Sequence, residues 1–114
     1  MPTSPELVPG AIAWAELDAV GREQGGRRPV LVVAGRACLD VVDQMALVVP
    51  ITSVDRGWPN HVALGGLGRP SFAMTEQLRP VSRSRMHGLV GVATTVELAQ
   101  VRGWLGDFLD LPAG

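Results

Sequence analysis

Apolar residues in this chain gather into short runs, and segments rich in glycine, proline and arginine separate one run from the next. Apolar runs of four to eight residues between such turn signals are typical of buried β-strands. The pattern predicts a turn of helix within residues 36–44, and strands over residues 11–17, 29–34, 45–52, 61–64, 71–75, 79–82 and 87–92.

Prolines constrain where these strands begin and end. Because proline lacks the backbone N–H that a ladder needs, we expect Pro29 at the first position of its strand and Pro50 at an edge or a bulge. Residues 18–28 and 53–60 are then polar loops. Residues 1–8 contain two prolines, and we expect them to be flexible.

The C-terminal segment has the period of a helix instead. Thr94 and Glu97 form a capping-box signature, which marks a helix start. Glycine weakens a helix, so Gly103 and Gly106 require this one to dock on the rest of the protein. Several short strands and one closing helix predict a single domain, residues 1–114, that is mainly β: a small, strongly bent antiparallel barrel. The apolar residues at helical spacing are Leu98, Val101, Leu105 and Phe108.

Composition excludes several classes of protein. Hydrophobic residues make up 46% of the 114, but no apolar run approaches the roughly 20 residues of a membrane-spanning helix. The N-terminus has no basic cluster followed by an apolar segment, so we expect a cytoplasmic protein with no membrane partner. His61, His87 and Cys38 are too far apart for the usual zinc-ligand spacing, and we expect no metal.

Charge is balanced overall but unevenly distributed. The formal net charge is −1, and all ten positive residues are arginines, most of them within 22–36 and 79–85. Such clusters can form a local basic surface that binds anions such as phosphate. The first cluster precedes an apolar run in GREQGGRRPVLVV, where glycines allow sharp turns and arginines offer planar forks of donors. Arg69 lies outside both clusters.

Four stretches, in this order, resemble the MazF/PemK family of toxin endoribonucleases from bacterial toxin–antitoxin systems. They are EQGGRRPVLVV at 23–33, VVPITS with RGWPNHV between 48 and 62, EQLRPVSRSRM at 76–86, and a terminal helix ending in GDFLDL. The resemblance extends from about Val8 to Leu111. It implies an SH3-like barrel of the MazF/CcdB/PemK type that forms a homodimer and needs no cofactor. It also implies sequence-specific, metal-independent cleavage of single-stranded RNA, which inhibits translation and growth, and restraint by a MazE-like antitoxin through its acidic C-terminal tail.

The resemblance also implies the residues of the site. Arg28, directly before the strand-opening proline, and Thr52, after the third strand's proline, match the catalytic pair of the family. Glu23 matches an acidic position that could act as a base or orient Arg28. The residues expected to contact RNA are Arg27, Ser53, Arg56, Trp58, His61, Gln77 and Arg79.

Plainer interpretations of the same residues stay open. Arg28 could be a solvated loop arginine, and Thr52 a strand-end hydroxyl that caps a turn. Trp58 and His61 could stack on bases, or Trp58 could cover the mouth of the barrel. At the level of function, the alternatives are a non-catalytic barrel toxin of the gyrase-poison type, and a degenerate family member that only binds RNA or an antitoxin.

Overall fold

The computed structural model of the protein describes residues 6–18 and 26–112. Its helices are α1 (Arg36–Val41) and α2 (Thr95–Phe108), with two short 3₁₀ turns, η1 (Thr75–Gln77) and η2 (Arg83–Arg85). Its strands are β1 (Ala11–Leu17), β2 (Gly26–Val32), β3 (Met45–Thr52), β4 (His61–Ala63), β5 (Phe72–Met74), β6 (Arg79–Ser82) and β7 (Met86–Val92).

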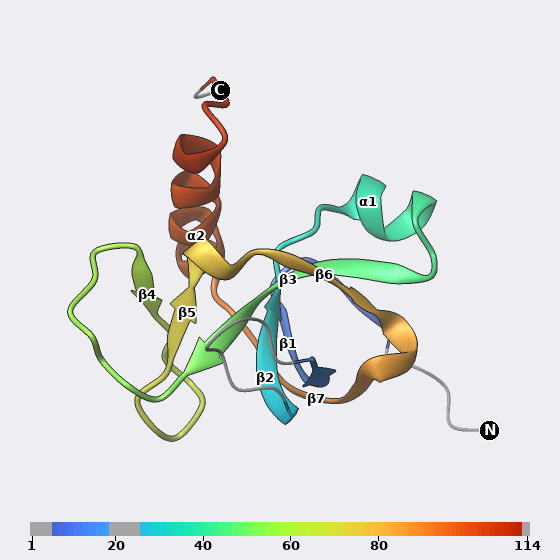
Figure 1. Ribbon diagram of the computed structural model, residues 1–114, viewed down its shortest axis with the longest axis horizontal. Helices are drawn as coiled ribbons and strands as arrows, with labels where there is room; N and C mark the ends of the chain where they lie inside the picture. The colour runs from blue at the N-terminus through green and yellow to red at the C-terminus, as the bar shows by residue number, and fades with distance from the viewer. Residues whose placement is uncertain (1–5, 19–25, 113–114) are drawn as a thin grey trace.

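The strands form one antiparallel sheet in the order β4-β5-β3-β2-β1-β7, and β6 adds to the first half of β3. This arrangement confirms the expected class, mainly β with a C-terminal helix. The sheet is strongly bent, as Figure 1 shows. It is not closed, because no ladder joins β6 to β7 within residues 26–112. None of the helices in the described part of the chain is long and apolar enough to cross a membrane.

Strand β3 changes partner along its length. Met45 to Val48 pair with β6, whereas Ile51 and Thr52 pair with β5. Pro50 lies between the two sets of pairs, where the missing N–H costs no ladder bond. The expectation of an edge or a bulge at Pro50 holds only locally: β3 as a whole lies inside the sheet, but at Pro50 its one paired neighbour is Val30 of β2.

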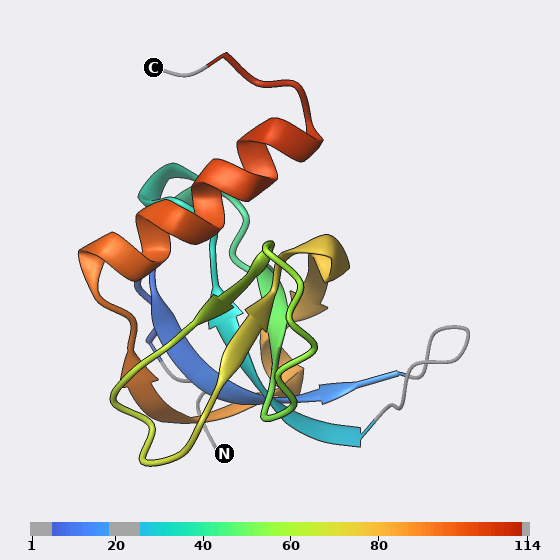
Figure 2. The same ribbon diagram turned by 90° about the vertical axis from the view of Figure 1, so that its left-hand side faces the viewer.

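Strand β2 begins earlier than predicted, at Gly26 rather than Pro29. Pro29 lies opposite Trp14 of β1, while pairing with β3 extends only from Val30 onwards. Pro29 therefore lies where β2 has a neighbour on one side only, which is where a strand tolerates proline. Arg27 and Arg28, predicted in a loop, lie on this strand. In Figure 2, β1 and β2 extend together beyond the rest of the sheet.

The sheet buries apolar side chains on both faces, because side chains alternate along each strand. Ala13 and Val30 belong to one core, while Ile12 and Leu31, their neighbours in sequence, belong to the other. Helix α2 covers the second core with Val101, which is fully buried. Leu7 packs in the first core, so the segment that we expected to be flexible is anchored at that residue.

The predicted capping box of α2 is confirmed. The Glu97 backbone N–H donates to Thr94 Oγ1 at 3.1 Å, and the Thr94 N–H donates to Glu97 Oε1 at 2.8 Å. Glu97 Oε2 also accepts the Gly65 N–H at 2.7 Å, which ties the helix start to the segment after β4. Arg102 donates to the Val33 carbonyl at 3.1 Å. Phe108, the last residue of the predicted apolar stripe, is exposed.

These contacts of Glu97 make stability depend on pH. Burial raises the pKa of Glu97, but the backbone N–H groups of Gly65 and Thr94 outweigh it and hold the pKa below its ordinary value of 4.5. A carboxyl with a lower pKa in the folded state stabilises the fold fully above its unfolded pKa, and this contribution is lost as pH falls through the folded pKa. We expect Glu97→Gln to destabilise the protein by about 1 kcal/mol at pH 7 and by much less at pH 3.

Urea unfolding at both pH values measures this difference. Asp40→Asn is the matched control. Asp40 is an exposed carboxylate on α1, and its ion pair with Arg36, at 3.6 Å, lies at the surface, where such pairs contribute little to stability. Equal losses for Glu97→Gln at pH 7 and pH 3 would contradict the assignment.

Candidate functional site

A pocket of about 330 Å³ opens between the start of β2, the end of β3 and the residues just before β5. Ser71, which is buried, forms part of its wall from the side of β5. The lining residues are Trp14, Arg27, Arg28, Pro29, Ile51, Thr52, Ser53, Val54, Arg69 and Ser71.

Strand register explains why Arg28 and Thr52 meet here. The last β2–β3 pair is Val30 opposite Pro50. Arg28 and Thr52 each lie two residues beyond this last pair, one on each strand, at the same end of the ladder. Both side chains line the pocket. The sheet therefore brings together the two residues that the sequence singled out as a catalytic pair.

Thr52 caps a turn, as the plainer interpretation suggested, and it also lines the pocket. Its Oγ1 accepts the Val54 backbone N–H at 3.2 Å, so the hydroxyl caps the turn that follows β3. A hydroxyl that accepts one N–H retains its own O–H as a donor. Thr52 is 9% exposed, and the turn holds its O–H at the wall of the pocket.

The pocket is positively charged. Arg27, Arg28 and Arg69 line it, and no carboxylate does so among residues 6–18 and 26–112. The Arg27 guanidinium lies over the Trp14 ring, 5.7 Å from its centroid, and Arg27 pairs across the strands with Glu16. Three guanidinium groups around one cavity are suited to bind a phosphate group together with the adjacent phosphates of the same chain.

Arg69, which the sequence pattern did not indicate, also lines the pocket. It precedes β5, and Phe72 of β5 pairs with Thr52, which brings the residues just before Phe72 to the pocket. That pairing joins segments twenty residues apart through β3, so no local pattern indicates it. The signal in the sequence was the lone arginine in a glycine-rich connection.

The remaining predicted residues are dispersed. Ser53 is exposed on the rim of the pocket. Glu23 falls outside the described residues. Arg56 and Trp58 are exposed on the loop 53–60, where the Arg56 guanidinium lies 5.9 Å from the centroid of the Trp58 ring.

Five of the expected RNA contacts lie outside the pocket lining: Arg56, Trp58, His61, Gln77 and Arg79. Gln77 donates to Met74 Sδ at 3.6 Å, and Arg79 donates to the Asp18 carbonyl at 3.4 Å. Both side chains are half-buried.

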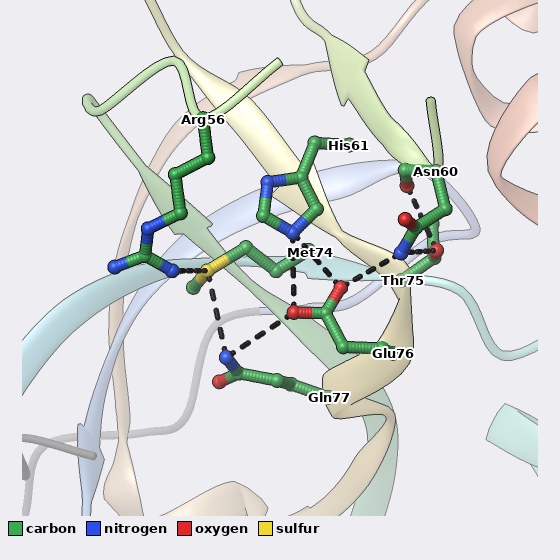
Figure 3. A network of polar contacts seen from close by, with 7 residues as sticks. All are labelled: Arg56, Asn60, His61, Met74, Thr75, Glu76 and Gln77. Atoms are coloured by element: carbon green, nitrogen blue, oxygen red, sulfur yellow. Dashed lines mark hydrogen bonds and ion pairs between the residues drawn. The ribbon is translucent and has the colours of Figure 1, made fainter. Parts of the chain in front are cut away.

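A polar network joins the end of the loop 53–60 to η1 (Figure 3). His61 Nε2 lies 2.9 Å from Glu76 Oε1 and 3.1 Å from Oε2. Asn60 Nδ2 donates to Glu76 Oε1 at 2.9 Å and to Thr75 Oγ1 at 3.1 Å. The His61 side chain is 2% exposed, so in this position its ring has no open face for a base.

The charge of Glu76 is stabilised by this network. Burial raises the pKa of Glu76, but the hydrogen bonds that its carboxylate accepts, first from His61, outweigh that effect and lower the pKa below 4.5. Glu76 is therefore ionised at neutral pH and can accept from both neighbours at once. In the described part of the chain, no three His, Cys, Asp or Glu side chains gather as metal ligands would.

Most of the chain matches the model of a known protein family. A family model described as PemK-like, MazF-like toxin of type II toxin–antitoxin system matches residues 9–109. The endoribonuclease toxin MazF of Escherichia coli (strain K12) is 30% identical over 95 residues, which are 82% of this chain and 85% of that protein.

Solved structures from Deinococcus radiodurans share the fold. A crystal structure of MazF has a TM-score of 0.80 and 33% identity, covering 96% of this chain and 99% of that one. A crystal structure of MazE–MazF has a TM-score of 0.77 and 32% identity, covering 97% of this chain and 100% of that one.

Proposed function

Because the chain belongs to the PemK-like, MazF-like toxins of type II toxin–antitoxin systems, we propose that it is an endoribonuclease that cleaves single-stranded messenger RNA at specific short sequences. The observation that carries this proposal is the pocket in which Arg28 and Thr52 lie together among three arginines. Cleavage of messages would inhibit translation and growth, and we infer that the protein acts in the cytoplasm, where messages are translated.

The reaction needs no group from outside the two macromolecules. The ribose 2′-oxygen attacks the adjacent phosphorus and gives up its proton to a base, while the bond from phosphorus to the 5′-oxygen breaks. The leaving oxygen takes up a proton, and the products are a 2′,3′-cyclic phosphate and a free 5′-hydroxyl. The enzyme must accept one proton, supply one, and stabilise the charge of the phosphorane between these events.

Arg28 and Thr52 match the last of these tasks. A guanidinium at the pocket wall can donate two parallel hydrogen bonds to the equatorial phosphorane oxygens. The Thr52 O–H, oriented by the Val54 N–H, can donate to the same charge. Arginine holds its proton firmly in water, so charge stabilisation is the role that we assign to Arg28 on physical grounds. Glu23 is the proposed base.

Arg27 and Arg69 extend the positive charge beyond the reacting phosphate. Neighbouring phosphates of a single strand lie within reach of such flanking guanidiniums, and each contact adds affinity that salt screens. Ser53 and Arg56 continue this surface along the loop 53–60, where the exposed ring of Trp58 offers a stacking platform for a base.

The same surface suits the proposed partners. One of the relatives in Deinococcus radiodurans was solved as MazE–MazF. We propose that a cognate MazE-like antitoxin restrains this chain by placing an acidic C-terminal tail over the arginines of the pocket, and that the toxin acts as a homodimer. The gyrase-poison alternative is not favoured, since the curated relatives are endoribonucleases and a protein-binding poison has no need of the Arg28–Thr52 pair.

Cleavage of a long RNA in EDTA tests the proposal. We expect cuts at a short recurring sequence, with a cyclic phosphate on one side and a 5′-hydroxyl on the other, because a 2′-hydroxyl attack leaves these ends. Mapping by primer extension and end-labelling identifies both. Cuts that require added metal, or that leave 5′-phosphates, would contradict the mechanism, and a degenerate family member would bind RNA without cutting it.

A further inference from the structure

The loop 53–60 ends in a turn that presents Trp58. The His61 backbone N–H donates to the Trp58 carbonyl at 3.1 Å and closes this turn. The rings of Trp58 and His61 contact each other with centroids 4.8 Å apart and planes tilted by 44°. The His61 ring therefore supports one side of the Trp58 ring, while Trp58 as a residue is 47% exposed.

Glu76 holds the His61 ring in place. Its two carboxylate oxygens lie 2.9 and 3.1 Å from His61 Nε2, as Figure 3 shows, and the ring is almost fully buried. His61 Nδ1 has no hydrogen-bond partner among the described residues. The only polar tether of the ring in the described part of the chain is thus the carboxylate of Glu76, and without it the ring could rotate about its side-chain bonds.

Glu76 also holds the other half of the turn. Asn60 Nδ2 donates to the same carboxylate at 2.9 Å, while Thr75 Oγ1 donates to the Asn60 carbonyl at 2.8 Å. Two consecutive residues after Trp58-Pro59 are therefore anchored to η1. Arg56, earlier in the loop, makes a weaker contact with Met74 Sδ at 4.0 Å.

We propose that Glu76 is a positioning residue for RNA recognition: by holding His61 and Asn60, its carboxylate fixes Trp58 in the orientation in which the ring receives a base. This inference rests on the proposed function. It differs from a catalytic role, because Glu76 does not line the pocket of Arg28 and Thr52, and both of its carboxylate oxygens face His61 or Asn60. Loss of the anchor frees the loop, so RNA binds more weakly while the chemical step at Thr52 is unchanged.

Binding and cleavage must be measured separately to test this role. The binding probe is a fluorescein-labelled RNA copied from the cut site mapped as above, with 2′-O-methyl riboses so that it cannot be cleaved, and the readout is anisotropy. The cleavage readout is the single-turnover rate at saturating protein on the unmodified RNA. We expect Glu76→Ala to raise Kd by about 10-fold and Trp58→Ala by about 10-fold or more, both with single-turnover rates within about twofold of wild type.

The variant that combines Glu76→Ala with Trp58→Ala tests whether Glu76 acts through Trp58. If Glu76 acts through Trp58, then Glu76→Ala adds less than about twofold to Kd in a Trp58→Ala background, because the ring that it positions is gone. Glu76→Gln keeps one acceptor oxygen and is expected to give an intermediate Kd. Asp43→Asn, which removes an exposed carboxylate elsewhere, is expected to bind as wild type does.

Three outcomes would overturn the inference. A lower single-turnover rate with an unchanged Kd would place Glu76 at the reacting phosphate or reflect general destabilisation. Independent, additive losses in the double variant would mean that Glu76 does not act through Trp58. A wild-type Kd for both Glu76 variants would mean that it positions nothing. A wild-type protein that cuts no RNA would instead overturn the proposed function, and this inference with it.

Discussion

Arg28→Ala and Thr52→Ala are each expected to lower the single-turnover rate of RNA cleavage by roughly 10²-fold or more. Each removes a donor aimed at charge that exists only in the transition state, so the rate falls while binding of the uncleaved RNA changes little. Because the two donors would serve the same charge, the double variant should lose much less than the product of the two single effects.

Three comparisons separate chemistry from folding in this experiment. Thr52→Ala also removes the acceptor for the Val54 N–H and is expected to cost about 1 kcal/mol of stability, which urea unfolding measures. Thr52→Ser keeps both functions of the hydroxyl and should retain most of the activity. Arg36→Ala, on the exposed face of α1, is the arginine control. Near-normal cleavage by Arg28→Ala or Thr52→Ala would remove that residue from the site.

Arg69 is unsuitable as such a control, although its position in the sequence suggested otherwise. It lines the pocket, and Arg69→Ala is expected to weaken RNA binding more than it slows the chemical step, because a flanking guanidinium acts on ground state and transition state alike.

An excess of an acidic peptide from the antitoxin tail is expected to abolish cleavage. Its carboxylates would lie where phosphates lie in the complex with RNA, against Arg27, Arg28 and Arg69, and its apolar side chains could pack on Trp58. The peptide loses conformational entropy as it becomes ordered, and the buried contacts offset that loss. In cells, coexpression of the cognate antitoxin should restore growth.

Competition between the peptide and labelled RNA measures this effect. Inhibition should weaken as salt rises from about 0.05 M to about 0.5 M, because mobile ions screen contacts between exposed charges. A peptide of the same composition in scrambled order tests whether charge alone suffices. A bound antitoxin that leaves RNA affinity unchanged would place the inhibitory surface elsewhere on the toxin.

Local pattern was sufficient to predict much of the fold. The strands 11–17, 45–52 and 79–82 have the predicted bounds, and the capping box of Thr94 was identified from two residues. The early start of β2 was missed because Pro29 was read as a strand opener. Whether a proline is tolerated depends on which neighbours a strand has at that point, and a single segment does not contain that information.

The pair of Arg28 and Thr52 was predicted from the resemblance to the MazF/PemK family and not from strand pairing. The two residues lie just beyond the last β2–β3 pair, at neighbouring positions on consecutive strands. Arg69 reaches the pocket through the β3–β5 pairing, which is non-local. The burial of His61 was missed for the same reason, since its partner Glu76 lies fifteen residues away on η1.

The change of partner along β3 has a consequence for local unfolding. Strands β4 and β5 are three residues long, and the ladder that joins β5 to β3 has only the pairs of Ile51 with Ala73 and Thr52 with Phe72. The segment that carries Arg69 therefore depends on side chains for its attachment, because Val62, Leu64 and Ala73 are buried in the second core and the Gly65 N–H donates to Glu97. Loss of that packing would loosen the pocket wall beside Thr52 and leave the β1–β2–β3 ladder paired.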